Sequence, residues 1–127
     1  MDNASFEKDL LTEKIIGCCF EVHKELGPGF IEKIYSKALQ HQLSIQKLSF
    51  EAEKEFDVLF KGHFVGRFRC DLFIENKVIV ELKSVTGFDM PKLFHKQLLS
   101  YLKASNIKTG LLINFGNQSC EVKRLSI

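Results

Sequence analysis

The sequence lacks a C-x-x-C pair, holds only two prolines, and contains no apolar run near the roughly 20 residues that span a bilayer. Four cysteines without that spacing offer neither a zinc knuckle nor a thioredoxin-type redox motif, so we expect reduced thiols. An iron–sulfur cluster is also disfavoured, because the adjacent Cys18 and Cys19 would point to different sides of a helix. Two prolines and eight glycines exclude a collagen-like or low-complexity chain, and twelve phenylalanines supply apolar surface for a core.

A strong excess of charge of one sign is also missing. Lysine and arginine number 18 against 16 aspartates and glutamates, and the net charge of +2 gives no field that would hold duplex DNA. The first residues lack the basic start and apolar centre of a signal peptide, and we therefore expect a cytoplasmic protein without membrane contact. With 45% apolar and 27% charged residues, the chain of residues 1–127 is expected to fold as one domain.

Two helices are predicted in the first third of the chain. Apolar residues recur at three- and four-residue steps from Glu7 to Leu26, which is the spacing of one buried helix face. Gly27-Pro28-Gly29 then stops this helix, because proline lacks an amide donor and glycine tolerates positive φ. A second helix is predicted to run to about Leu43, with an inner face made of Ile31, Ile34, Tyr35, Ala38 and Leu39.

The pattern then changes to strands. Alternating apolar and polar residues predict strands over Leu48–Phe60 and Phe64–Ile74, and an apolar run predicts a covered strand over Val78–Val85. A third helix is expected to start near Pro91, followed by strands over Leu111–Phe115 and Cys120–Ile127. Its predicted inner face comprises Leu93, Phe94, Leu98, Leu99 and Leu102. The order ααβββαββ predicts an α/β fold with a mixed central sheet flanked by helices.

Charged residues inside segments built for burial are the strongest functional signal. Glu81 and Lys83 lie two apart in the apolar strand and therefore share one of its faces. Asp71 stands on the preceding predicted strand, joined by a tight turn, and reaches the same neighbourhood. Carboxylates on adjacent strands with a lysine beside them form an oxygen site suited to Mg²⁺, and the lysine can orient or deprotonate an attacking water.

These residues resemble a known family. Asp71, followed after nine residues by Glu81-Leu82-Lys83, is similar to the active-site signature of the PD-(D/E)-x-K nuclease superfamily, although Cys70 stands where the superfamily name places proline. Gly29-Phe-Ile-Glu32-Lys-Ile-Tyr35 resembles the motif of the GxxExxY proteins, and Gln97-Leu-Leu-Ser-Tyr101 resembles the Q-x-x-x-Y element of RecB-like nucleases. Leu111-Leu-Ile-Asn-Phe-Gly116 resembles the closing strand of the family, so the likeness covers about residues 11–125.

The resemblance implies a restriction-endonuclease-like fold and a Mg²⁺- or Mn²⁺-dependent nuclease that hydrolyses phosphodiester bonds in DNA. It implies metal ligation by Asp71, Glu81 and Glu32, with Lys83 and Gln97 also catalytic. Tyr35 and Tyr101 would contact substrate or support the site. The spacings agree, since residues three or four apart share one helix face. A small domain of low net charge has little surface to grip a duplex, so dimerisation or a protein partner is expected.

Simpler interpretations remain open for the same residues. Glu81 and Lys83 alone are also typical of an exposed strand face, and Glu32 of a helix start that favours acidic side chains. Arg67, Arg69, Lys92 and Lys96 would form either a phosphate-binding rim or ordinary solvated charge. The alternative function is a catalytically inactive module of the same fold that binds nucleic acid or a protein, because a shared fold does not guarantee shared chemistry.

Overall fold

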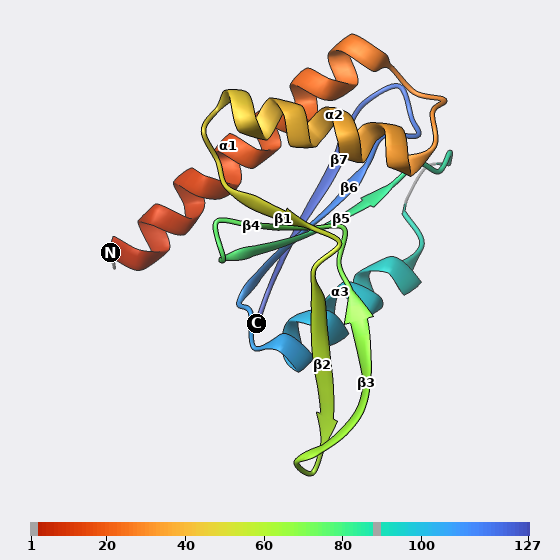
Figure 1. Ribbon diagram of the computed structural model, residues 1–127. Helices are drawn as coiled ribbons and strands as arrows, with labels where there is room; N and C mark the ends of the chain where they lie inside the picture. Colours follow the sequence, from red (N-terminus) through yellow and green to blue (C-terminus); the bar gives the residue numbers. More distant parts are fainter. Residues whose placement is uncertain (1–2, 88–89) are drawn as a thin grey trace.

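The protein is described by a computed structural model that covers residues 3–87 and 90–127. Helices α1 (Asn3–Leu26) and α2 (Glu32–Ile45) pack on one face of a five-stranded sheet, and α3 (Lys92–Ser105) packs on the other (Figure 1). Among the helices of the described ranges, none combines the length and apolar character needed to cross a membrane.

The sheet is mixed, as the sequence predicted. Its strand order is β1-β4-β5-β6-β7, and only the central β5–β6 pair is parallel. Helix α3 makes the crossover between these two parallel strands, as parallel pairing requires. The strand bounds are β1 Phe50–Ala52, β4 Leu72–Ile74, β5 Val78–Lys83, β6 Thr109–Asn114 and β7 Glu121–Ser126.

The central strands are covered on both faces, which explains their nearly continuous apolar sequence. Val78, Val80 and Leu82 of β5 belong to the core beneath α1 and α2, whereas Ile79 belongs to the core beneath α3. Because side chains alternate along a strand, Glu81 and Lys83 lie on the α3 face with Ile79. The predicted placement of these two charged groups on one face of a buried strand is therefore confirmed.

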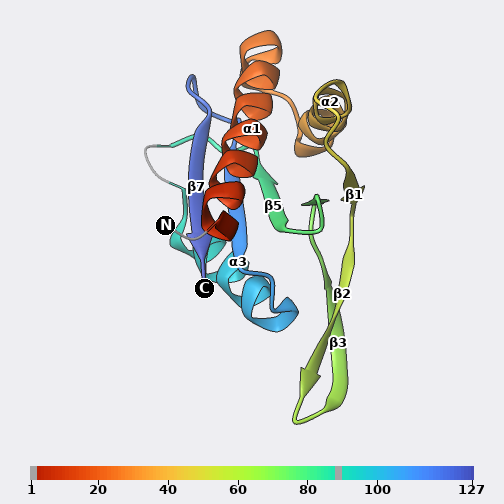
Figure 2. The ribbon, with the colours of Figure 1, turned by 90° about the vertical axis from the view of Figure 1, so that its left-hand side faces the viewer.

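Two predicted strands are each broken in the structure. The segment Leu48–Phe60 forms β1 and then β2 (Glu55–Phe60), which belong to different sheets, because Glu53 turns the chain with a φ of 55°. Phe64–Ile74 likewise divides into β3 (His63–Arg69) and β4, so that Asp71 lies between strands and not within one. The strands β2 and β3 form a separate hairpin that extends beyond the main sheet (Figures 1 and 2).

The predicted helices are present with different inner faces. The buried face of α2 consists of Tyr35, Leu39 and Leu43. Two residues of the predicted inner face therefore lie outside the core: Ile31, which is the N-cap and is 66% exposed, and Ile34. On α3 the core face is filled by Leu98 and Leu102, and Leu93 in the first turn is 70% exposed. The first helix begins at Asn3, four residues before the predicted Glu7, and the strand predicted over Val78–Val85 ends at Lys83.

A buried asparagine joins the chain beyond β5 to the end of β6. The Asn114 side-chain oxygen accepts hydrogen bonds from the backbone N–H of Val85 at 2.9 Å and of Gly116 at 3.0 Å, and its amide donates to the Val85 carbonyl at 2.9 Å. Gly116 is needed for this approach, since a Cβ built there would lie 2.2 Å from the Val85 oxygen. The segment that leaves Lys83 is thus fixed by close backbone packing.

We expect Gly116→Ala to lower the free energy of unfolding by about 2–3 kcal/mol, because the added methyl meets rigid backbone. Urea unfolding followed by circular dichroism would measure the change. Gly17→Ala is the matched control: this glycine lies inside α1 with no atom within 4 Å of the added Cβ, and alanine there should stabilise the protein by about 0.5–1 kcal/mol. Equal stability of Gly116→Ala and the native protein would contradict the close packing.

Candidate active site

Asp71 and Glu81 are held next to each other by the pairing of β4 with β5. The partners Leu72 and Val80 lie opposite each other, which brings the residue before β4 beside the residue after Val80. The backbone N–H of Asp71 donates to a Glu81 carboxylate oxygen at 3.3 Å, and the backbone N–H of Leu82 donates to an Asp71 carboxylate oxygen at 2.7 Å. The Glu81 carboxylate is therefore oriented by the backbone of Asp71, and the Asp71 carboxylate by the backbone of β5.

Glu81 is a buried acid with a strongly raised pKa. Only 6% of the residue is exposed, and burial, followed by the neighbouring charge of Asp71, raises the pKa of the Glu81 carboxyl to about 9. The ammonium of Lys83 acts in the opposite direction and lowers this pKa, without cancelling the effect of burial. A buried carboxyl beside a second carboxylate needs a positive charge, which a proton or a cation can supply.

Lys83 lies between the sheet and α3. Its side chain is half-buried, and its ammonium lies 4.3 Å from the centre of the Phe94 ring of α3, within the range of a cation–π contact. The charge of Lys83 lowers the pKa of both Glu81 and Glu32, so one ammonium lies within electrostatic reach of both acids. The aromatic face thus keeps the cation close to the carboxylates.

Glu32 approaches the site from the helix on the opposite face of the sheet. It is the first residue of α2, and partial burial raises the pKa of its carboxyl, with a smaller contribution from Asp71 in the same direction. The structure therefore places Glu32 within electrostatic reach of Asp71 and Lys83. Within residues 3–87 and 90–127, however, no three His, Cys, Asp or Glu side chains gather closely enough to hold a metal ion.

Tyr35 supports the site from inside the core. Its hydroxyl donates to the Gly27 carbonyl at 2.5 Å and accepts from the Phe30 backbone N–H at 3.2 Å, and its ring stacks on Phe115 with the centroids 4.5 Å apart. The side chain is fully buried. Tyr35 therefore fixes the loop that leads into Glu32, and its role in substrate contact or site support stays a prediction.

The two α3 residues of the predicted site differ in their surroundings. The Tyr101 ring stacks on Phe68 with the centroids 4.1 Å apart, and its pKa is raised by burial and then by the charges of Glu81 and Asp71. Tyr101 therefore lies within the electrostatic field of the carboxylates. Gln97, one turn earlier, is exposed, and its side chain makes no hydrogen bond to any part of the chain that the structure describes. Its catalytic role remains a prediction.

A groove opens beside Asp71 and contains residues that sequence analysis missed. It encloses about 450 Å³ between α2 and the end of β1, and Asp71 and Leu82 lie along it. The α2 wall is polar and consists of Glu32, Lys33, Ser36, Lys37 and Gln40. The sequence signal for this wall is the spacing of positions 33, 36, 37 and 40, which places their side chains on one face of a helix. A second cavity of about 380 Å³ also includes Glu32, together with Ser84 and Thr86.

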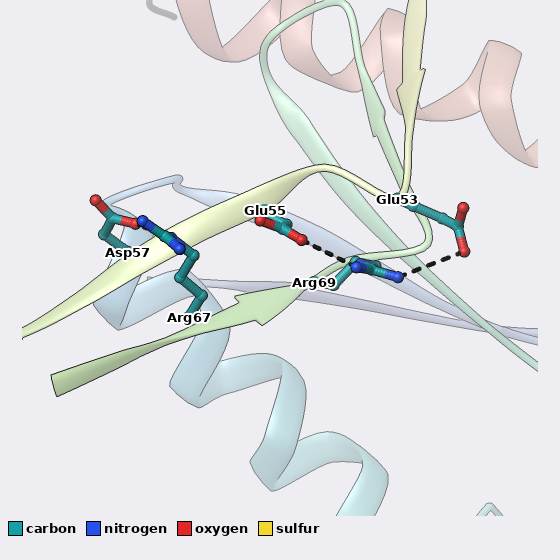
Figure 3. A network of polar contacts seen from close by, with 5 residues as sticks. All are labelled: Glu53, Glu55, Asp57, Arg67 and Arg69. Carbon is teal, nitrogen blue, oxygen red and sulfur yellow. Dashed lines mark hydrogen bonds and ion pairs between the residues drawn. The ribbon is translucent and has the colours of Figure 1, made fainter.

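The arginines of the hairpin are already paired with acids. Arg67 donates to Asp57 at 2.8 Å, and Arg69 contacts Glu55 at 2.9 Å and Glu53 at 4.0 Å (Figure 3). These contacts raise the pKa of both guanidinium groups, chiefly through the hydrogen bonds. Of the two interpretations of these arginines, the structure favours exposed paired charge over a phosphate-binding rim.

The mixed sheet, the helices on both its faces and the acidic pair where β4 meets β5 define the restriction-endonuclease-like class of α/β folds. The sequence profile of the PD-(D/E)XK nuclease superfamily matches residues 9–125, so the chain belongs to this superfamily. Among solved structures, the crystal structure of SSO0001 is similar with a TM-score of 0.59 and 21% identity. The match covers 74% of this chain but only 48% of SSO0001, and it supports the fold alone. No curated protein matches the chain.

The buried acid predicts an unusual pH dependence of stability. The folded protein keeps a proton on Glu81 up to about pH 9, whereas the unfolded chain releases it near the ordinary pKa of 4.5. The folded state therefore binds more protons within this interval, and the free energy of unfolding should fall as pH rises through it. In Glu81→Gln this decrease should be smaller, and near pH 8 in a chelator the variant should exceed the native protein by on the order of 2 kcal/mol.

Urea unfolding at a series of pH values would measure this effect. Glu21→Gln, an exposed substitution on α1, is the control and should keep the native pH dependence. If the free energy of unfolding of Glu81→Gln fell with pH as steeply as that of the native protein, groups other than Glu81 would set the pH dependence.

Proposed function

We propose that the protein is a metal-dependent nuclease that hydrolyses phosphodiester bonds in DNA, and that it belongs to the GxxExxY proteins of the RecB-like branch. Membership of the PD-(D/E)XK superfamily supports nuclease chemistry in general. The observation that carries the proposal is the contact between Asp71 and Glu81, with the Lys83 ammonium within electrostatic reach of Glu81. An energetically costly arrangement of this kind is typical of a site that binds a cation.

The residues fit a divalent metal by their chemistry. Asp71 and Glu81 supply carboxylate oxygens, which Mg²⁺ and Mn²⁺ prefer, and Mg²⁺ usually takes only one or two carboxylates together with waters and substrate phosphates. Glu32 would add a ligand or orient a water from the α2 side. When bound, the metal would stabilise negative charge on the phosphate and lower the pKa of a water.

The chain's own residues have separate tasks in this mechanism. Lys83 would orient the attacking water and help remove its proton, and Phe94 keeps the ammonium in place for that step. Gln97 and Tyr101 would contact or steady the substrate from α3, while Tyr35 holds the loop before Glu32. We also propose a cytoplasmic location, one domain over residues 1–127, and a second copy or a protein partner that extends the DNA-binding surface.

A second candidate function is an inactive nuclease-fold module that binds nucleic acid or a protein. One observation favours it: no three potential ligands converge on a metal position in the described part of the chain. The two candidates differ in the response to metal and in the presence of cleavage.

Cleavage is the direct test of the proposed chemistry. We expect the native protein to cut DNA in Mn²⁺ or Mg²⁺, and Asp71→Ala and Lys83→Ala each to slow the single-turnover rate by about 100-fold or more. Lys24→Ala, which removes an exposed lysine of α1, should cut at the native rate. Full activity in either site variant would refute the assigned roles, and no cleavage by the native protein would favour the binding module.

Metal binding gives an independent prediction. By mass action, Mn²⁺ at about 100 times its Kd would add about 2.7 kcal/mol to the free energy of unfolding and raise the Tm. The increase should be lost in Asp71→Asn but kept in Asp57→Asn, whose carboxylate lies in the hairpin paired with Arg67. Differential scanning calorimetry with and without metal would measure it. An equal rise in native protein and Asp71→Asn would show that the metal binds elsewhere.

A further inference from the structure

The polar face of α2 forms one wall of the groove that ends at Asp71. Lys33, Ser36, Lys37 and Gln40 succeed one another along this face, and Gln40 donates a hydrogen bond to Ser36 at 3.2 Å. The facing wall is formed in part by Ala52 and Leu82, which are small or apolar. The groove therefore combines positive charge and hydrogen-bond donors on one side with an apolar surface on the other.

The two lysines of this wall are available for a ligand. In the described ranges neither the Lys33 nor the Lys37 ammonium takes part in an ion pair, in contrast with the paired Arg67 and Arg69 of the hairpin. Positions four apart on a helix lie about 6 Å apart along its axis and on the same side. The groove therefore presents two neighbouring unpaired cations beside the acidic site.

The acids of the groove lie where they do not cancel these cations. Asp71 is half-buried and hydrogen-bonded to the backbone of Leu82, and Glu53 contacts Arg69 at 4.0 Å. Glu32 is the first residue of α2 and lies toward Lys83. Along α2 the groove thus carries an acid at the first residue of the helix, a cation at the next residue, Lys33, and a second cation at Lys37 about one turn further on.

We propose that this groove binds the backbone of one nucleic-acid strand next to the bond that is cleaved, with Lys33 and Lys37 contacting neighbouring phosphates. The inference rests on the proposed nuclease function and adds the residues that place the strand. Ser36 and Gln40 supply hydrogen bonds to phosphate or sugar, and the exposed Ala52 packs against the sugar or base. The order of charges along the groove sets the position of the strand: when two phosphates contact the lysines, the next phosphate lies near Asp71.

Salt-dependent binding tests this groove separately from catalysis. The experiment measures fluorescence anisotropy of labelled single-stranded and duplex DNA oligonucleotides with the full chain in a chelator, over a series of NaCl concentrations. Each lost phosphate contact reduces the slope of log K against log salt by about 0.7 for a single strand and 0.9 for a duplex. The Lys33→Gln/Lys37→Gln variant should therefore bind about tenfold more weakly, with the slope reduced by about 1.4 or 1.8.

Two further variants separate phosphate contact from net charge and folding. Lys24→Gln/Lys123→Gln removes the same charge from exposed positions outside the groove and should keep the native slope. Lys33→Arg/Lys37→Arg retains both cations and should keep most of the affinity. All variants should unfold at the native Tm within a few degrees.

The outcomes distinguish the two proposals. A reduced slope confined to the glutamine variant of the groove supports the strand-binding role, even if the native protein cuts no DNA, in which case only the nuclease function fails. Cleavage by the native protein together with an unchanged slope in that variant overturns the groove and leaves the nuclease function standing. Absence of binding to both oligonucleotides, or an equal loss in the Lys24 and Lys123 control, also overturns the groove.

Discussion

The contact between two acids beside the two inner strands β4 and β5 of an apolar sheet is the constraint on which the site depends. Glu81 has lost nearly all its water and lies beside Asp71, so its charged form is destabilised by both desolvation and repulsion. The surrounding residues reduce this cost: backbone N–H groups bond to both acids, and Lys83 is held near them by Phe94. The part of this cost that these contacts do not offset favours a proton or a cation at the two acids.

Much of the architecture could be predicted because periodicity reports burial directly. Helices, the mixed sheet and the charged face of β5 followed from apolar spacing, since each pattern has one structural solution. The breaks at Glu53 and Asp71 could not, because the alternation of side chains continues when the chain passes from one sheet to another. The positive φ of Glu53 could not be predicted, because glutamate has no preference for it. The turn at Gly27 and Gly29 could be predicted, because glycine tolerates positive φ.

The site shows the same division. Asp71, Glu81 and Lys83 were identified because charge within an apolar segment is unusual, and the structure brings these three together. Lys33 and Lys37 escaped notice, because lysines on a helix normally face solvent and only the tertiary structure shows a wall opposite them. The predicted joint ligation of a metal by Glu32, Asp71 and Glu81 depends on side-chain positions that no spacing fixes, and in the described residues no three such groups gather closely enough to hold an ion.

The projecting hairpin has a mechanical consequence for this arrangement. Its strand β3 ends at Arg69, one residue from Cys70 and two from Asp71, and its base is attached by hydrogen bonds from Cys70 to Lys54 and from Glu53 to Asp71. Large apolar side chains, among them Phe60 and Phe64, are exposed toward the far end of this lever. A load on the hairpin would reach Asp71 through its base, where Arg69 and Cys70 lead into the acid and Glu53 donates a hydrogen bond to it, so the hairpin and the acidic pair are coupled in position.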